Sequence, residues 1–134
     1  MPQGEFSLNT GGRREFVDLS GRLRELLEEQ SFGDGLLALF NPHTTAGLTI
    51  NEGADPDVRR DMLDALARMV PDGEAYRHAE GNSPAHVMAS LVGSSVSIIV
   101  RQGRMQLGTW QHVFFCEFDG PRRRSVRWLF LPDR

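Results

Sequence analysis

Segments that are apolar on both faces constrain the fold of this chain more than any other feature. Residues 36–40 form a continuous apolar run of strand length, which Asn41-Pro42 ends. Residues 105–118 are apolar at odd and even positions alike. A strand covered on one face alternates apolar and polar residues, so both segments predict strands buried on both faces. Gly108 predicts a bend or bulge inside the longer segment.

The remaining elements follow from alternation, turn residues and helix caps. Further strands are predicted at residues 5–10, 13–19, 46–50, 96–100 and 125–131. Gly11-Gly12 predicts a hairpin between the first two strands, and Gly103 predicts another turn within residues 101–104. Three helices are predicted at about residues 21–30, 56–69 and 84–91, with Ser20, Asp55 and Ser83 as N-caps. In the second helix the residues expected to be buried are Val58, Met62, Ala65, Leu66 and Met69.

These elements predict an α+β fold for residues 1–134 as a single compact domain. About seven strands should form a largely antiparallel sheet, with about three helices on one side. Strands with two apolar faces in a chain with so few helices also suggest that other subunits cover part of the sheet.

Composition excludes several classes of function. The net charge of −3 gives no reason to expect a nucleic-acid or membrane partner. No apolar run is long enough to span a bilayer. A single cysteine, Cys116, excludes an intramolecular disulfide. The first five residues carry no signal-peptide pattern, so we expect a cytoplasmic protein.

Two histidines and a carboxylate flank one predicted helix start. His78 and Glu80 precede the turn residues Gly81 and Asn82, and His86 lies at the third position of the helix that Pro84 opens. A loop folded back over this helix start can bring both imidazoles to one point. Free N–H groups at the helix start would favour an anion there.

Polar residues gather in four short segments, each where a strand or helix starts, stops or bends. They are His43-Thr44-Thr45, Asn51-Glu52, residues 78–86 and Thr109-Trp110-Gln111. His43, His78 and His86 could ligate a divalent metal, most suitably zinc, with one coordination position left open. Alternatively, they are hydrogen-bonded polar residues that surround an anion.

The other candidates divide into catalytic and binding residues. Glu52 and Glu80 could act as general acid or base, or could fix a histidine tautomer. Gln111 is the third catalytic candidate. The binding candidates are Thr44, Thr45, Asn51, Asn82, Thr109 and Trp110.

Three further features are interpreted as structural. His112 points away from Gln111 in an extended strand. Cys116 lies in an apolar strand, so we expect a buried, unreactive thiol. The run Arg122-Arg123-Arg124 follows a turn and is expected to be a solvated hairpin end.

The polar segments together resemble the YjbQ-like family, also called the secondary thiamine-phosphate synthase enzyme family. The resemblance includes the segments 43–52, 54–58, 78–86, 93–95, 108–111 and 116–121, in the same order along nearly the whole chain. It implies a compact α+β protein that assembles as a homotrimer. It also implies a site built from the His, Asn-Glu and Thr-Trp-Gln motifs, often with a metal.

Three functions follow as hypotheses. The leading one is a transferase that joins a pyrimidine pyrophosphate to a thiazole phosphate and releases pyrophosphate. The second is a metal-assisted hydrolase of a small phosphorylated or amide substrate, with Glu52 or Glu80 as the base. The third is a non-catalytic trimeric module that binds a phosphorylated metabolite.

Overall fold

Two antiparallel sheets and three helices make up the part of the chain that the computed structural model describes, residues 2–134. The larger sheet contains β1 (Gln3–Asn9), β8 (Arg123–Pro132), β3 (Gly35–Phe40), β5 (Ser95–Arg101) and β6 (Arg104–Met105), in that spatial order. The smaller sheet contains β2 (Glu15–Asp18), β7 (Gln111–Glu117) and β4 (Ala46–Glu52). The helices are α1 (Ser20–Glu29), α2 (Pro56–Met69) and α3 (Ser83–Val92). The predicted α+β class is confirmed; Met1, the first residue of the segment assessed for a signal peptide, lies outside the described residues.

The predicted hairpin between the first two strands is wrong. β1 pairs with β8 and β2 pairs with β7, so the chain crosses from one sheet to the other between them. The predicted turn at Gly103 is confirmed, with φ of 74°. The segment 105–118 divides at the predicted bend: β6 ends at Met105, and β7 begins only after a loop at residues 106–110.

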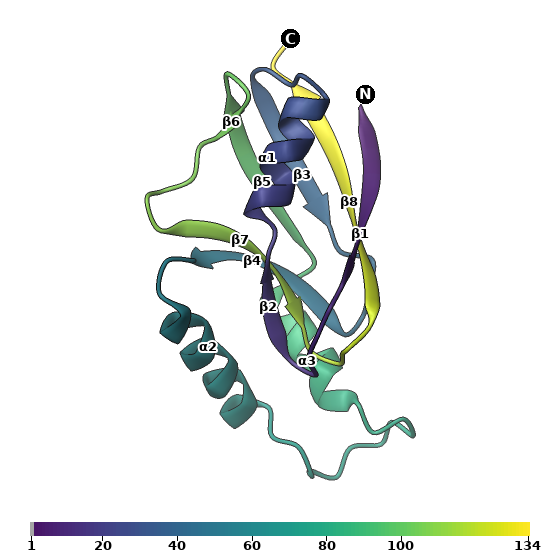
Figure 1. Cartoon of the computed structure of the whole chain (residues 1–134). Coiled ribbons are helices and arrows are strands. Elements are labelled where there is room, and N and C mark those ends of the chain that lie inside the picture. Colours follow the sequence, from purple (N-terminus) through teal and green to yellow (C-terminus); the bar gives the residue numbers. More distant parts are fainter. Residues whose placement is uncertain (1) are drawn as a thin grey trace.

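β7 is the central strand of the smaller sheet and is buried on both faces, as predicted. Val113 and Phe115 pack into a core shared with α1 and the larger sheet. Phe114, Cys116 and Phe118 pack on the opposite face, in a second core that includes residues of α3. The helices therefore cover two faces rather than one: in Figure 1, α1 lies in front of the larger sheet, whereas α3 lies behind the smaller sheet.

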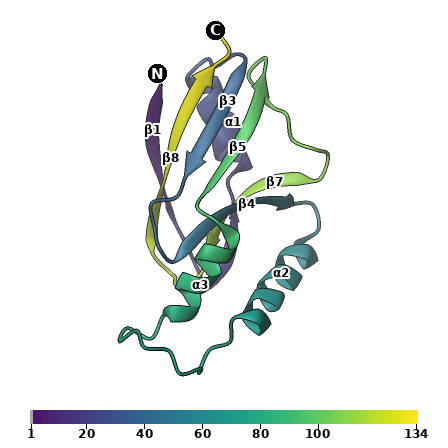
Figure 2. The ribbon, with the colours of Figure 1, turned by 180° about the vertical axis from the view of Figure 1, so that it is seen from behind.

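The prediction for residues 36–40 is correct for one face only. Leu37 and Leu39 are buried in the core, whereas Phe40 is 48% exposed on the outer face of the larger sheet. Figure 2 shows this outer face and α3 on the same side of the molecule.

A side-chain cap explains where α2 begins, whereas α1 and α3 begin without one at the cap position. The Asp55 side chain accepts a hydrogen bond from the Asp57 N–H at 2.9 Å, so α2 begins at Pro56 as predicted. α1 includes Ser20, which was predicted to be its cap. α3 begins at Ser83 with Asn82 at the cap position, so His86 is its fourth residue rather than its third.

The expected burial of α2 is wrong. No residue of this helix is buried, and Met69 is 64% exposed. The helix lies at the side of the smaller sheet (Figure 1) and reaches the second core only through the partly buried Leu63 and Leu66. The positions expected to be buried are spaced correctly for an apolar stripe, but no sheet surface covers the whole stripe.

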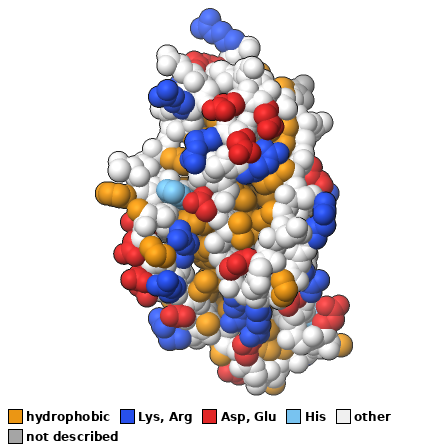
Figure 3. Space-filling model, viewed as in Figure 1, with side chains coloured by type: hydrophobic (Ala, Val, Ile, Leu, Met, Phe, Trp, Pro, Cys, Tyr) orange, Lys and Arg blue, Asp and Glu red, His pale blue; other side chains and the backbone are white. Residues whose placement is uncertain are grey.

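The surface carries charges of both signs. Figure 3 shows acidic and basic side chains interspersed over the α1 side of the molecule. Within residues 2–134, no helix is long and apolar enough to cross a membrane.

Candidate functional site

A polar cavity of about 260 Å³ brings most of the predicted site residues together. It lies where the β3–β4 connection, the loop before α3 and the β7–β8 connection meet. Its lining residues are His43, Thr44, Thr45, His78, Glu80, Asn82, His86, Arg122 and Arg124. The sequence therefore identified seven of these nine positions, and the two arginines are new.

His78 and His86 face each other across this cavity. Their ring centroids are 5.4 Å apart and the rings are nearly perpendicular. α3 fixes the backbone of His86, whereas His78 lies on the exposed loop that precedes the helix. The two imidazoles therefore lie close together at the start of α3.

Hydrogen bonds at both the backbone and the ring fix the position of His43. Asn41 accepts a hydrogen bond from the His43 N–H at 3.0 Å and donates one to the His43 carbonyl at 3.2 Å. At the other end of the side chain, Nε2 of His43 accepts a hydrogen bond from the Ser125 N–H at 2.9 Å.

The bond from Ser125 follows from where β3 ends. Phe130 donates its N–H to Pro2 on the β1 side of β8, so alternation directs the N–H of odd-numbered β8 residues toward β3. β3 ends at Phe40, opposite Arg127, so the N–H of Ser125, the next one that points toward β3, has no strand partner. The imidazole of His43 takes that place.

This bond determines the tautomer of His43. A ring nitrogen that accepts a hydrogen bond cannot carry a proton, so the proton of the neutral ring is on Nδ1. Burial, and then the positive charge of Arg124, lower the pKa of His43 below its usual 6.5. His43 therefore offers the cavity a donor rather than a lone pair.

The predicted three-histidine metal site does not fit this arrangement. Two imidazoles that share a tetrahedral ion at about 2.1 Å have centroids roughly 5 Å apart, which His78 and His86 satisfy. His43, by contrast, has already used its lone pair on Ser125. Within residues 2–134, no three His, Cys, Asp or Glu side chains are grouped as a metal ion requires.

Arg124 corrects the expectation of a solvated arginine run. Its side chain is 4% exposed, and it forms a buried ion pair with Glu117, which is fully buried. Arg122 matches the expectation better: it is exposed at the rim and pairs with Asp119 at 2.9 Å. The alternation of β8 carries the signal that could have found Arg124, because it shares a face with the buried Val126 and Trp128.

Asn82 and the two threonines occupy different depths in the cavity. Asn82 donates a hydrogen bond from Nδ2 to Asp119 at 2.9 Å, so it holds the loop before α3 against the β7–β8 connection. Burial would raise the pKa of Asp119, but the hydrogen bonds from Asn82 and Arg122 lower it below its usual value. Thr45 is buried and accepts a hydrogen bond from Arg124 at 2.9 Å, whereas Thr44 is exposed.

The other predicted site residues form a second group at the far end of β7. Glu52 lies opposite Gln111 in the register of β4 and β7. Gln111 accepts a hydrogen bond from the Gly108 N–H at 2.8 Å, and Trp110 is 62% exposed. Six residue steps of about 3.4 Å separate Gln111 from Glu117, roughly 20 Å in all. Within one chain, therefore, the structure does not bring Asn51, Glu52, Thr109, Trp110 and Gln111 to the histidine cavity.

His112 and Cys116 lie outside the cavity. Nδ1 of His112 lies 2.5 Å from Asp18, whose other carboxylate oxygen accepts a hydrogen bond from the Ser20 N–H at the start of α1. Cys116 is fully buried, and burial raises the pKa of its thiol. The expectation of a buried, unreactive cysteine agrees with this environment.

Comparisons with solved structures match nearly the whole chain. An uncharacterized conserved protein from Clostridium acetobutylicum superposes with a TM-score of 0.91 at 48% identity, over 95% of this chain and 98% of that one. A hypothetical protein from Aeropyrum pernix K1 superposes with a TM-score of 0.93 at 36% identity, over 99% of this chain and 100% of that one.

Sequence comparisons give the same relationship. The UPF0047 protein YugU of Bacillus subtilis is 47% identical over 119 residues, covering 88% of this chain and 90% of the relative. A UPF0047 protein of Methanocaldococcus jannaschii is 46% identical over 130 residues, covering 97% and 94%. The model of the family described as UPF0047 protein YjbQ-like matches residues 4–133. The chain therefore belongs to the YjbQ-like UPF0047 family.

Proposed function

We propose that the histidine cavity binds the phosphate group of a small phosphorylated molecule. The observation that carries this proposal is Arg124, a buried guanidinium that lines a polar cavity. Guanidinium groups match the geometry of phosphate oxygens and are weakly hydrated, so they bind phosphate well when buried. The Nδ1–H of His43 and the hydroxyl of Thr44 supply further donors in the same cavity.

The size of the cavity suggests how the rest of the ligand is accommodated. About 260 Å³ is slightly less than the 300–1,000 Å³ that is typical of small-ligand sites. An adjacent hollow of about 480 Å³ also has His78 in its wall, together with Arg13 and Tyr76. We infer that the phosphate occupies the first cavity and that the remainder of the molecule extends past His78 into the second.

A transferase of the thiamine-phosphate synthase type is the reaction we favour within this class. Both of its substrates carry phosphate, and the leaving pyrophosphate needs donors that stabilise its developing charge. Arg124 and Arg122 would bind that group, while His78 and His86 would hold or move a proton. A hydrolase is the second candidate, favoured by the proximity of His78 and His86, either of which could deprotonate water beside Glu80.

A divalent metal remains part of this proposal with a reduced set of ligands. His78 and His86 alone would hold it, and His43 would not take part. Such an ion would act as a Lewis acid toward the phosphate oxygens. We also propose that the protein acts in the cytoplasm, as its sequence suggests.

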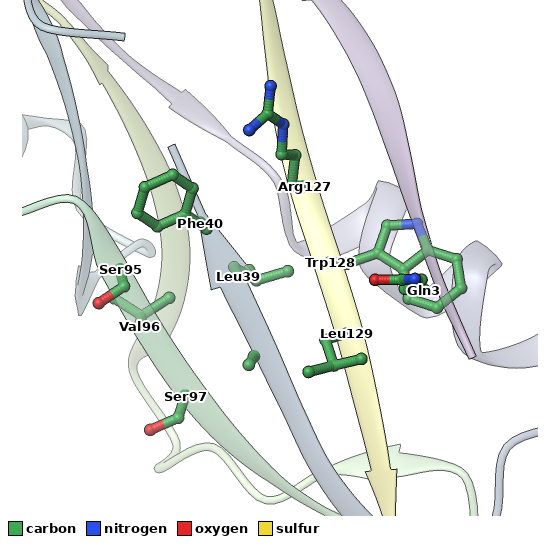
Figure 4. Close-up of a pocket in the computed structure, with 10 residues that line it drawn as sticks. Gln3, Leu39, Phe40, Ser95, Val96, Ser97, Arg127, Trp128 and Leu129 are labelled. Atoms are coloured by element: carbon green, nitrogen blue, oxygen red, sulfur yellow. The ribbon is translucent and has the colours of Figure 1, made fainter. Parts of the chain in front are cut away.

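We further propose that the protein is a homotrimer. The outer face of the larger sheet exposes Phe40 (48%) and Ile99 (56%), and α3, which lies on the same side of the molecule in Figure 2, contains the exposed Leu91 (56%). Figure 4 shows Phe40 and Leu129 around the hollow on this sheet face, with Arg127 at its border. Soluble monomers rarely expose large contiguous apolar patches, so apolar residues gathered on one face favour an interface. Another subunit would cover it, and could also bring Gln111 and Glu52 closer to a neighbouring histidine cavity.

Isothermal titration calorimetry with matched pairs of ligands tests phosphate binding directly. The pairs are the thiazole phosphate and its free alcohol, and the pyrimidine pyrophosphate and its free alcohol. We expect the phosphorylated members to bind and the alcohols to bind at least about tenfold more weakly, because they lack the charged acceptor. Equal affinity within both pairs would contradict phosphate recognition. Release of pyrophosphate when both phosphorylated compounds are present would then distinguish the transferase from a binding module.

A further inference from the structure

Arg124 is the most deeply buried charge that reaches the cavity. It lies on β8, and its partner Glu117 is the last residue of β7. The two side chains are 4% and 0% exposed. A buried ion pair loses hydration on both sides, and a well-packed apolar pair often gives equal or greater stability. Stability alone therefore does not account for this pair.

The hydrogen bonds of Arg124 leave one nitrogen uncommitted. Nε donates to Oε1 of Glu117 at 2.8 Å, and Nη2 donates to the other oxygen of the same carboxylate. Nη2 also donates to the hydroxyl of Thr45 at 2.9 Å. Within residues 2–134, Nη1 has no hydrogen-bond partner. It is not fully buried, so solvent or a ligand can reach it. Because Arg124 lines the cavity and its other nitrogens are bonded, Nη1 is the guanidinium nitrogen free to donate to a ligand there.

Glu117 is itself held from two further directions. The Thr10 hydroxyl donates to Oε1 at 2.7 Å, and the Asp119 N–H donates to Oε2 at 3.0 Å. Burial would raise the pKa of Glu117, but these bonds and Arg124 hold it below its usual value. The carboxylate of Glu117 is therefore ionised and fixed in position, and it holds the guanidinium of Arg124 in place.

We propose that Glu117 is the positioning residue of the phosphate site: it holds two nitrogens of Arg124 so that Nη1 is presented to a bound phosphate. This inference rests on the proposed phosphate-binding function. The charge of Glu117 offsets that of Arg124, so the pair adds little net positive charge to the cavity. Its main contribution is a hydrogen-bond donor whose direction is fixed. Ligand binding then needs no reorganisation of the arginine, which lowers the entropic cost of association.

Titration of wild type and Glu117→Gln with inorganic phosphate, by calorimetry and ³¹P NMR, tests the inference. We expect Glu117→Gln to weaken phosphate binding about tenfold or more, because the guanidinium loses its charged, two-point support. Thr10→Val is the matched control, since it removes the bonds of the Thr10 hydroxyl to Glu117 and to the Arg122 backbone but leaves both bonds between Glu117 and Arg124 intact. We expect Thr10→Val to change phosphate affinity less than about threefold even where it lowers the urea midpoint.

The outcomes separate this inference from the function on which it rests. Wild-type protein that binds no phosphate contradicts the proposed function itself. Wild-type binding together with unchanged affinity in folded Glu117→Gln contradicts only the positioning role. Equal weakening by both variants would also contradict it, because a general loss of order would then explain the result.

A measurement on the wild-type protein covers the case in which Glu117→Gln does not fold. The side-chain ¹⁵N–¹H signals of Arg124 can be assigned by comparison with Arg124→Lys. We expect the Nη1 signals to shift on addition of phosphate while the Nε signal, which reports the bond to Glu117, keeps its position. Phosphate that shifts the His86 signals but leaves Arg124 unchanged would overturn the proposal.

Discussion

Ser125 donates its backbone N–H to Nε2 of His43 at 2.9 Å, and this contact between a strand and a loop determines which hydrogen-bonding role the histidine can take. We predict that His43 is the Nδ1–H tautomer in solution. Ring ¹⁵N chemical shifts distinguish a protonated nitrogen from one that bears a lone pair, and His43→Gln assigns the signals. An Nε2–H tautomer for His43 at pH 7.5 would show that this bond is absent in solution.

The lowered pKa of His43 predicts a specific pH dependence of stability. The folded protein resists protonation of this ring, whereas the unfolded chain takes up the proton near the usual pKa of 6.5. Below that pH the unfolded state binds more protons, so the free energy of unfolding falls as pH drops from about 6.5 toward the folded pKa. His43→Gln, which cannot titrate, should reduce this fall in urea titrations between pH 7.5 and 5. An unchanged slope would mean that other groups cause the dependence.

Gly53, the residue after β4, lies directly against the His112 ring. A Cβ at this position would lie 2.1 Å from Cγ of His112, so Gly53→Ala must displace the imidazole from Asp18. We expect a loss of about 1–3 kcal/mol in the free energy of unfolding, as for other overpacked sites. In the His112→Ala background the same substitution should cost much less, because the clashing ring is gone. Equal costs in both backgrounds would exclude this steric explanation.

The features that could be predicted from the sequence are those with local causes. The start of α2 depends on Asp55 and Pro56, which are adjacent in the chain, and it was placed correctly. The partner of β1 depends on Arg123–Pro132, more than 100 positions away, and no turn residue encodes that choice. Gly11-Gly12 does end a strand, but the chain then enters the other sheet.

The same distinction applies to the site. His43, His78 and His86 are recognisable from residue type and from the turns and caps around them, and they do line one cavity. The buried position of Arg124 depends on the ion pair that it forms with Glu117, which lies on β7 in the other sheet. Arginine after a turn is usually solvated, so only the alternation along β8 could have indicated its burial.

The proposed trimer predicts that charges on the outer sheet face weaken assembly. Phe40 and Ile99 are exposed there, so Phe40→Glu with Ile99→Arg should not disturb the core. Light scattering at micromolar concentration should show a trimer for wild type and smaller species for the double variant. Glu25→Arg, an exposed change on α1, serves as the control and should leave the mass unchanged. A monomeric wild type would contradict the proposal.

The last prediction concerns which histidines can bind zinc. His78 and His86 have ring centroids 5.4 Å apart, as two ligands of one ion would, whereas Nε2 of His43 is bonded to Ser125. Zinc titration by calorimetry should therefore give an affinity at least about tenfold lower for His86→Ala than for wild type. His43→Gln should remain within about threefold of wild type, because its carbonyl oxygen can still accept the Ser125 N–H. A zinc-binding imidazole must be neutral, so zinc occupancy should fall on acidification. Equal losses in both variants would show that His43 leaves Ser125 to complete a three-histidine site, and wild-type affinity in His86→Ala would exclude a metal between His78 and His86.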